Sequence, residues 1–304
     1  MYHSARAKTR VQEPFGDKVF NAINLLIMVL MLLIILYPLY FIVIASFSDP
    51  NLVNSGQVLF WPRGYTIEGY TRMLNHDDLW RGYRNSLIYT AGGTLFSLVV
   101  TIPAAFTLAN RHTRGKRLFT FIFTFTMMFS GGMIPTYLVV KQLDLINTPW
   151  ILMINGGFTA YNLVVSRTFM QTIPQELLEA AEIDGTSVWQ CFFQIVLPLS
   201  KAIIAVMALF YGVARWNDYF SALIYTSDQE LVPLQMVLRR ILLQSESVAS
   251  SASGSDPETM AMMARISELM KYCVIIAASV PAMLVYPFVQ KHFVKGVMLG
   301  SLKG

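Results

Sequence analysis

The sequence predicts an all-α integral membrane protein, built as a bundle of six transmembrane helices with a pair of short helices on the cytoplasmic side. Three observations indicate this class. Of 304 residues, 55% are hydrophobic and 13% are charged, and that charged share is about half of what an ordinary soluble domain carries. Six apolar runs are each long enough to cross a hydrocarbon core ~30 Å thick. Basic residues gather in short segments between the runs, which is typical of cytoplasmic loops.

The predicted spans follow the apolar runs in order. They cover residues 20–47, 87–109, 118–140, 150–167, 202–226 and 269–289. The first run is longer than the apolar core of a signal peptide, so we expect it to remain as an anchor. The fourth run is diluted by polar residues and glycines, which leaves five crossings as the alternative to six. No run alternates as a β-barrel strand does, so the bundle is helical.

The basic segments set the expected orientation. Residues 1–19 form a basic leader, residues 111–117 carry four Lys or Arg side chains, and residues 294–304 form a basic tail. We expect all three on the cytoplasmic side, with both termini there, which requires an even number of crossings and favours six. The transmembrane domain then covers residues 20–293, with exterior loops at residues 48–84 and 227–268.

The second exterior loop is expected to contain a low-complexity segment. Residues 245–258 are rich in serine and show no apolar period. A plain linker and a docking element for an outside partner are both compatible with this composition.

Metal, disulfide and nucleic-acid chemistry find no support in the sequence. Cys191 and Cys273 fall on opposite sides of the membrane in this topology, so they cannot form a disulfide within one chain. Neither has CxxC spacing or a nearby histidine, so we interpret both as apolar filler and expect no metal site. The net charge of +5 reflects membrane orientation, because no basic patch with interleaved aromatic residues indicates a nucleic-acid partner.

The cytoplasmic connection at residues 172–200 predicts two short helices joined at a glycine. Thr172 and Gln175 have the spacing of a capping box for the first helix. Gly185 is placed to end that helix, because glycine permits an elbow that a side chain would resist. Thr186 is the expected N-cap of the second helix, which should stop near Pro198 because proline cannot continue the hydrogen-bond ladder.

The polar side of this helix pair is acidic. It carries Glu176, Glu179, Glu182 and Asp184 beside apolar residues. An amphipathic linker lying on an anionic leaflet would carry Lys and Arg instead. We therefore expect the pair to enter a groove on a soluble protein whose rim supplies basic partners.

The same residues follow a pattern, E-A-A-x3-G-x9-I-x-L-P. Every position is filled, by Glu179, Ala180, Ala181, Gly185, Ile195, Leu197 and Pro198. The pattern resembles the cytoplasmic loop signature of permease subunits of binding-protein-dependent ABC importers. Tyr37-Pro38, the cluster at residues 216–219 and the tail FVKGVMLGSLKG extend the resemblance over essentially the whole chain. They are similar to the second permease of the carbohydrate-uptake family, in the branch that serves oligosaccharides and polysaccharide fragments.

The resemblance implies a division of labour. This loop would be the EAA coupling helix, seated in a cleft of a cytosolic ATPase. Its coupling residues would be Glu179, Ala180, Ala181, Asp184, Gly185, Ile195, Leu197 and Pro198. The expected partners are a second homologous permease that completes a heterodimer, two ABC ATPase subunits, an extracytoplasmic solute-binding protein and the lipids of a bacterial inner membrane. ATP and Mg would bind to the ATPase, and we expect no cofactor and no catalytic residue on this chain, which has no G-x4-GK[ST] phosphate loop.

Polar groups within predicted spans indicate function by default, because burying them in hydrocarbon is costly. Arg215 and Asp218 are three residues apart in the fifth span and can form a locking ion pair or line a pore. Trp216 and Tyr219 offer stacking surfaces for a pyranose, and Asn217 and Asp218 offer partners for its hydroxyls. Weaker candidates for the substrate path are Tyr89, Tyr161 and Asn162.

Two other classes of protein compete with the importer hypothesis. An intramembrane enzyme is disfavoured, because the chain has neither H-E-x-x-H nor G-x-S-x-G. A gradient-driven secondary transporter is the remaining alternative, although it would need no acidic cytoplasmic helix pair.

The family branch implies oligosaccharide substrates, with uronate-containing fragments such as those of alginate or pectin among them. Outward-facing arginines are compatible with an acidic sugar and equally with docking of a binding protein. They are Arg63, Arg72, Arg81, Arg84, Arg239 and Arg240.

Overall fold

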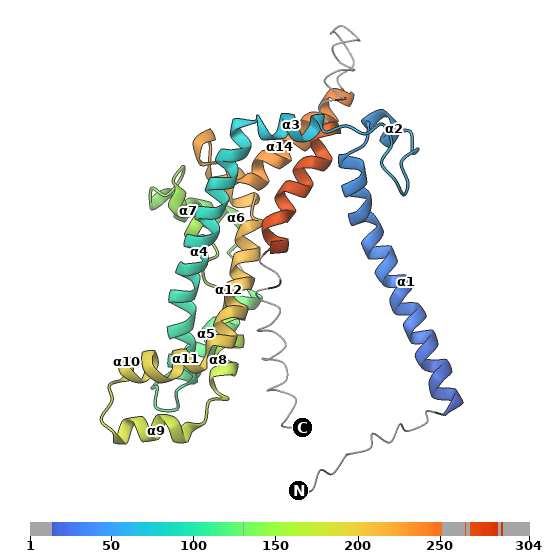
Figure 1. Ribbon diagram of the computed structural model, residues 1–304. Coiled ribbons are helices and arrows are strands. Elements are labelled where there is room, and N and C mark those ends of the chain that lie inside the picture. The colour runs from blue at the N-terminus through green and yellow to red at the C-terminus, as the bar shows by residue number, and fades with distance from the viewer. Residues whose placement is uncertain (1–13, 130, 251–264, 266–267, 285–286, 288–304) are drawn as a thin grey trace, which may run out of the picture. The chain divides into compact units, whose positions relative to one another are not determined.

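The computed structural model describes residues 14–129, 131–250, 265, 268–284 and 287. All regular secondary structure in these residues is helical, as Figure 1 shows, which confirms the predicted all-α class. The chain forms two compact units, residues 1–67 and residues 68–304.

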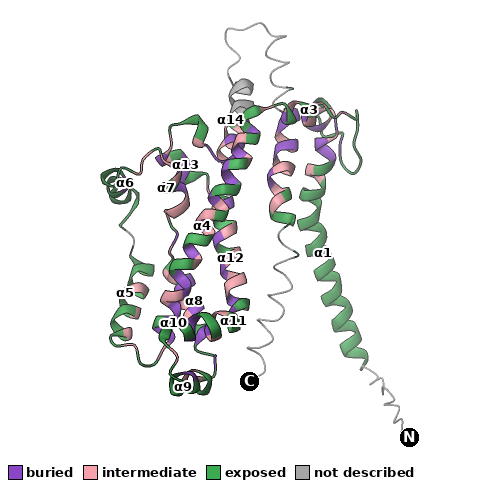
Figure 2. Cartoon of the chain, turned by 60° about the vertical axis from the view of Figure 1, so that its left-hand side comes forward, coloured by how far each residue is buried: buried purple, intermediate pink, exposed green. Residues whose placement is uncertain are grey.

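The first unit is a long helix followed by a folded connection. Helix α1 (Phe15–Ser46) is apolar and exposed along almost its whole length (Figure 2). Helix α2 (Pro50–Asn54) is capped by the Asp49 carboxylate, which accepts a hydrogen bond from the Asn51 N–H at 2.9 Å. The backbone then returns, because the Asp49 N–H donates to the Arg63 carbonyl and the Thr66 N–H donates to the Phe47 carbonyl, both at 3.0 Å. This part of the predicted exterior loop is therefore ordered against the end of α1.

The second unit is arranged around α4 (Asp77–Ala109), which follows the short helix α3 (Glu68–Leu74). Helix α4 begins within the predicted exterior loop 48–84, so the predicted span 87–109 is only its second part. Helices α7, α8, α12 and α14 all pack against it. Their bounds are Pro149–Ile154, Ala160–Met170, Lys201–Trp216 and Leu234–Ser250.

Three of the predicted spans differ from single straight helices. The run 118–140 is divided between α5 (Lys116–Met128) and α6 (Met133–Gln142), and the helix direction bends by 117° from one to the other. The run 150–167 is divided between α7 and α8, and the run 202–226 between α12 and α13 (Phe220–Tyr225). The length of an apolar run alone does not register such breaks, because apolar residues continue on both sides of the few polar residues and glycines that interrupt it.

Helix length and apolarity identify the candidate membrane crossings among the described residues. In the described residues, α1 and α4 are each long and apolar enough to cross a bilayer alone. Two bent pairs raise that number to four if each pair counts as one span: α5 with α6, and residues 188–199 with α12. Six crossings remain a prediction. The helical residues 268–284 overlap the last predicted span, 269–289.

The second predicted exterior loop contains regular structure. A 3-10 turn, η2 (Gln229–Leu231), leads into α14, whose residues Leu234, Val237, Leu238 and Ile241 are buried at helical spacing. The serine-rich segment 245–258 shows no apolar period, yet its first part, residues 245–250, is the end of α14. Residues 251–258 lie outside the described residues.

Candidate functional site

The first helix of the predicted coupling loop is α9 (Gln175–Ile183). Its predicted capping box is wrong: the N-cap is Pro174, without a side-chain bond, and the Thr172 hydroxyl donates to the Phe169 carbonyl at 2.7 Å. The Thr172 hydroxyl thus belongs to the turn that ends α8 and does not cap α9. Pro174 has φ −55° and starts the helix through its fixed backbone instead.

The end of α9 is a Schellman motif centred on Gly185. This glycine has φ +76°, the Gly185 N–H donates to the Glu182 carbonyl at 3.0 Å, and the Thr186 N–H donates to the Ala181 carbonyl at 3.1 Å. Those two bonds satisfy carbonyls that the end of a helix leaves without partners. The predicted role of Gly185 in ending the helix is confirmed.

The second helix begins one residue later than predicted. Ser187, not Thr186, is the N-cap of α10 (Val188–Cys191), and Ser187 and Gln190 form a capping box with bonds of 3.3 and 2.8 Å. The Thr186 hydroxyl is instead occupied, because it donates to the Ala181 carbonyl at 2.7 Å. Threonine can serve either function, so local spacing did not distinguish them.

The second helical run ends at Leu199, near Pro198 as predicted, although the proline is not its last residue. After α10 come a π-helical segment, η1 (Phe192–Val196), and α11 (Leu197–Leu199), so Pro198 lies inside the helical run. The wider turn of η1 shifts the hydrogen bonds, and the Leu197 N–H donates to the Phe192 carbonyl. At Ser200 the chain turns by 79° into α12.

The motif residues separate into a buried set and an exposed set. Ala181 is 5% exposed, and it packs in one apolar cluster with Cys191 and Phe192. Ile195 and Leu197 are half-buried against the same cluster. The residues on the outer side are exposed: Glu179, Ala180, Asp184, Gly185 and Pro198. The first set fixes the loop to the bundle, and the second is available to a partner.

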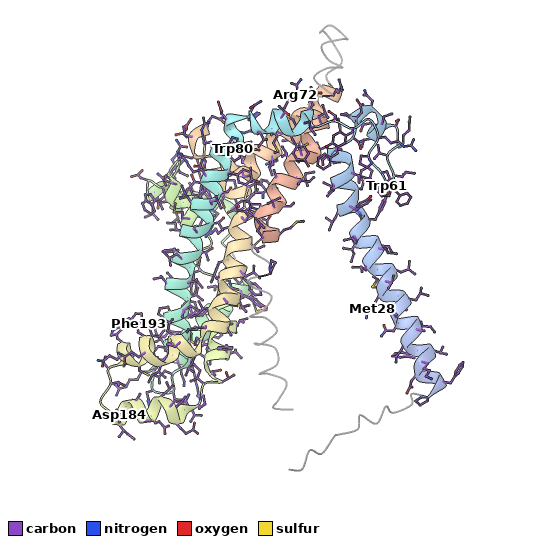
Figure 3. The ribbon with its side chains drawn as sticks, viewed as in Figure 1. Met28, Trp61, Arg72, Trp80, Asp184 and Phe193 are labelled. Carbon is purple, nitrogen blue, oxygen red and sulfur yellow. The ribbon has the colours of Figure 1, made fainter. Side chains whose placement is uncertain are left out.

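The exposed surface of the loop is apolar as well as acidic. Ile183 is 87% exposed, and Val188, Trp189 and Phe193 are each more than half exposed. Figure 3 shows Asp184 and Phe193 projecting from this end of the unit. We call Ile183, Val188, Trp189 and Phe193, together with the exposed acids Glu176, Glu179 and Asp184, the coupling surface. Large apolar side chains in this number on one exposed surface indicate an interface.

The base of the coupling loop contacts the basic connection between α4 and α5. His112 Nδ1 lies 3.6 Å from a Glu182 carboxylate oxygen, and both side chains are largely exposed. Behind this contact, burial raises the pKa of the Cys191 thiol, and the negative charge of Glu182 raises it further. Both cysteine side chains are buried.

The polar cluster at residues 215–219 lies at the break between α12 and α13, and its members point to two different places. Arg215, with a side chain only 6% exposed, turns toward α7, where its Nη1 donates to the Leu152 carbonyl at 3.5 Å and lies 4.0 Å from Asp218 Oδ2. Asp218 Oδ1 accepts a bond from the Ser221 N–H at 3.0 Å in the first turn of α13. These two residues therefore hold the break together.

Trp216, Asn217 and Tyr219 line a common pocket. The pocket has a volume of about 570 Å³ and lies between the break, α14 and the helical residues 268–284. The Trp216 ring is buried, and its Nε1 donates to the Ala278 carbonyl at 3.1 Å. Tyr219 is 41% exposed, and the guanidinium carbon of Arg239 lies 5.0 Å from the centre of its ring.

The weaker candidates for the substrate path lie elsewhere. The buried Tyr89 donates its hydroxyl to the Leu231 carbonyl at 3.0 Å, so it anchors the segment before α14. Asn162 is buried in the first turn of α8, whereas its neighbour Tyr161 is 57% exposed. Neither residue lies among those that line the described pocket.

Sequence analysis missed the residues that hold α14 in place. The Asn85 amide donates to the Glu230 and Val232 carbonyls at 2.7 and 3.1 Å, and the Ser86 hydroxyl accepts the Leu234 N–H at 2.9 Å. Both are buried polar residues four or three positions before Tyr89, and this spacing on one helix face could have indicated them. Within the described residues, no three His, Cys, Asp or Glu side chains are grouped so as to hold a metal ion.

Comparisons with known proteins agree with this architecture. Residues 83–299 match the family described as the binding-protein-dependent transport system inner membrane component. Protein LplC of Bacillus subtilis strain 168 is 39% identical over 95% of this chain and 96% of its own. The polygalacturonan/rhamnogalacturonan transport system permease protein YtcP of the same strain is 36% identical over 95% of this chain and 99% of its own.

A solved structure is also similar to this one. It is a chain from a bacterial ABC transporter involved in the import of the acidic polysaccharide alginate, with 29% identity and a TM-score of 0.83. The match covers 93% of this chain and 99% of that one. The predicted resemblance is confirmed, and the chain belongs to the family of binding-protein-dependent transport system inner membrane components.

Proposed function

We propose that this chain is one of two permeases of an ATP-driven importer for oligosaccharides, with uronate-containing fragments as the favoured class. The observation that carries the proposal is the coupling surface, which combines exposed carboxylates with the exposed side chains of Ile183, Trp189 and Phe193. Such a surface suits a groove on a soluble protein, with apolar side chains in its floor and basic residues at its rim.

The proposed motor is a pair of cytosolic ABC ATPase subunits, which bind ATP and Mg in place of this chain. When the two subunits close on ATP, each seated helix has to move with its cleft, because its apolar side chains are buried there. The motion then passes through the compact run α10–η1–α11 and the 79° turn at Ser200 into α12. In this proposal the chain transmits the movement of the ATPase subunits to the membrane helices and catalyses no reaction.

The proposed substrate class follows from the relatives. One is a permease for polygalacturonan and rhamnogalacturonan, and the similar structure belongs to a system for alginate. Uronate units occur in each of these polymers. A solute-binding protein would deliver the sugar from outside, with both termini of this chain in the cytoplasm of a bacterial cell.

The test is ATPase activity of the reconstituted complex, which contains this chain, its partner permease, the ATPase and the binding protein. We expect stimulation by uronate-containing oligosaccharides above the rate with binding protein alone. If the complex hydrolyses ATP at the same rate with every sugar, the assignment of carbohydrate as the substrate is wrong. The proposal that the loop couples to the ATPase is not affected by that result.

A second experiment separates this proposal from the gradient-driven alternative. ATP is depleted in cells while the proton gradient is held by an external pH step, and uptake of labelled oligosaccharide is followed. An ATP-driven importer stops, whereas continued uptake would favour the secondary transporter.

A further inference from the structure

The pocket beside the break between α12 and α13 combines one cation with an aromatic ring and neutral polar groups. We propose that it binds one carboxylated sugar unit of the transported chain and that Arg239 is the residue that selects the carboxylate. This inference rests on the proposed function, since it names the sugar chemistry that the permease itself recognises.

Arg239 is the one charged side chain among the described residues that line the pocket. Its Nη1 is buried without a hydrogen-bond partner among the described residues, and its guanidinium lies over the ring of Tyr219. Burying an unpaired donor is unfavourable, and the cost is larger when the group is charged. A carboxylate would remove that cost, because its two oxygens match the planar donor fork of a guanidinium.

Three of the other five arginines expected to face outward have side-chain partners. Arg72 pairs with Glu68 at 2.8 Å, and Arg81 pairs with Asp78 at 2.9 Å and with Glu230 at 3.1 Å. Arg240, the neighbour of Arg239, donates to the Gln229 side chain. Arg239 differs from these three, because its contact is the ring of Tyr219 and its buried Nη1 has no hydrogen-bond partner among the described residues.

The rest of the lining suits a pyranose. A pyranose has apolar C–H faces and a rim of hydroxyl groups, so it needs an aromatic surface together with amide and hydroxyl partners. Tyr219 supplies the partly exposed ring, and Asn217, Gln235 and Ser279 supply the neutral polar groups. The volume of about 570 Å³ is within the usual range for small-molecule sites.

The position of the pocket connects recognition with the coupling loop. Trp216, the last residue of α12, lines the pocket, and the first residue of α12, Lys201, directly follows the turn at Ser200. Displacement of α12 by the coupling loop would therefore change the pocket as well. Sugar release and ATPase closure could in this way be linked through a single helix.

The experiment measures ATPase stimulation of the reconstituted complex by an oligogalacturonide and by its carboxyl-reduced, neutral counterpart, each titrated as a preformed complex with the binding protein. Arg239→Gln and Arg239→Met remove the charge, Arg239→Lys keeps it, and Arg240→Gln is the matched control. We expect the Gln and Met variants to need about tenfold more acidic sugar for half-maximal stimulation, as the loss of one charged hydrogen bond implies. The Lys variant should recover part of that loss, and Arg240→Gln should match the wild type.

Failure of the subsite is distinguishable from failure of the proposed function. If no oligosaccharide stimulates the wild-type complex, the proposed function fails. Two results with a responsive wild type would show that Arg239 is not a carboxylate selector. In the first, Arg239→Gln and Arg239→Met are stimulated by the acidic sugar as strongly as the wild type. In the second, both variants lose stimulation by the acidic and the neutral sugar to the same extent. If Lys is as defective as Met, packing against Tyr219 or a partner subunit explains the position instead. Size-exclusion chromatography of each complex verifies that the variants assemble.

Discussion

The carbonyl oxygen of Ala181 accepts two hydrogen bonds from Thr186, from its N–H at 3.1 Å and from its hydroxyl at 2.7 Å. This double contact fastens the end of α9 to the start of the next helix. It requires the chain to reverse at Gly185, whose φ of +76° is a conformation that L side chains rarely adopt. The alanine and the glycine of the motif are thus two parts of one turn.

Gly185→Asp should abolish sugar uptake while the chain still inserts. An added Cβ at Gly185 would meet nothing within 4 Å, so the effect comes from the backbone. The strain of about 1 kcal/mol or more is expected to open the turn and displace the coupling surface. The measurement is transport in cells, together with immunoblotting of the membrane fraction.

Gly56→Asp is the matched control for that variant. Gly56 has φ +72° and equally open surroundings, but it lies in the connection after α2. We expect wild-type uptake from it. Equal uptake by the Gly185 and Gly56 variants at normal protein levels would remove Gly185 from the coupling mechanism.

Glu179→Lys should weaken assembly with the ATPase, because it reverses an exposed charge of the coupling surface. Glu179→Gln, which only removes the charge, should have a smaller effect of about 1 kcal/mol or less, as for an exposed ion pair. The amount of ATPase that co-purifies with the permease pair at low and high salt measures both. The coupling role of the charge would be excluded if the Lys variant retained the ATPase as well as the wild type.

Gly93→Ala should destabilise the bundle, and Gly92→Ala should not. A Cβ at Gly93 would lie 2.9 Å from the Met153 carbonyl and 3.0 Å from Arg215 Nε, whereas a Cβ at Gly92 meets only the flexible Met153 side chain. Overpacking of this kind costs about 1–3 kcal/mol. Melting temperatures in detergent distinguish the two variants, and equal melting temperatures would contradict the close approach of α4 to α7 and α12.

Labelling of Cys191 by a thiol reagent should be slow at neutral pH and should accelerate as the pH rises above 9. The pKa of this thiol is raised by burial and by Glu182, so the reactive thiolate is scarce below the raised pKa and increases as the pH approaches it. The experiment uses a Cys273→Ala background. A labelling rate that levelled off below pH 8 would show that the pKa of Cys191 is not raised.

The sequence predicted the residues of the coupling loop better than those of the pocket. The coupling residues follow a linear motif within about twenty residues, so their spacing was readable from the sequence. The local caps at Thr172 and Thr186 were assigned wrongly, because a hydroxyl has several backbone partners within reach and only the folded turn selects one. The pocket could not be anticipated, since Tyr219 and Arg239 come from separate elements.

The sequence by itself determined that this is a helical membrane protein with an acidic pair of short helices, because apolar run length, charge distribution and a contiguous motif are all local properties. The tertiary structure decided which helices break, which motif residues face outward and which polar side chains meet. Tyr89 illustrates the difference: its position in an apolar run favoured a role in the substrate path, but packing directs its hydroxyl to the Leu231 carbonyl. A side chain takes its role from the element packed against it, and that element can lie more than a hundred residues away.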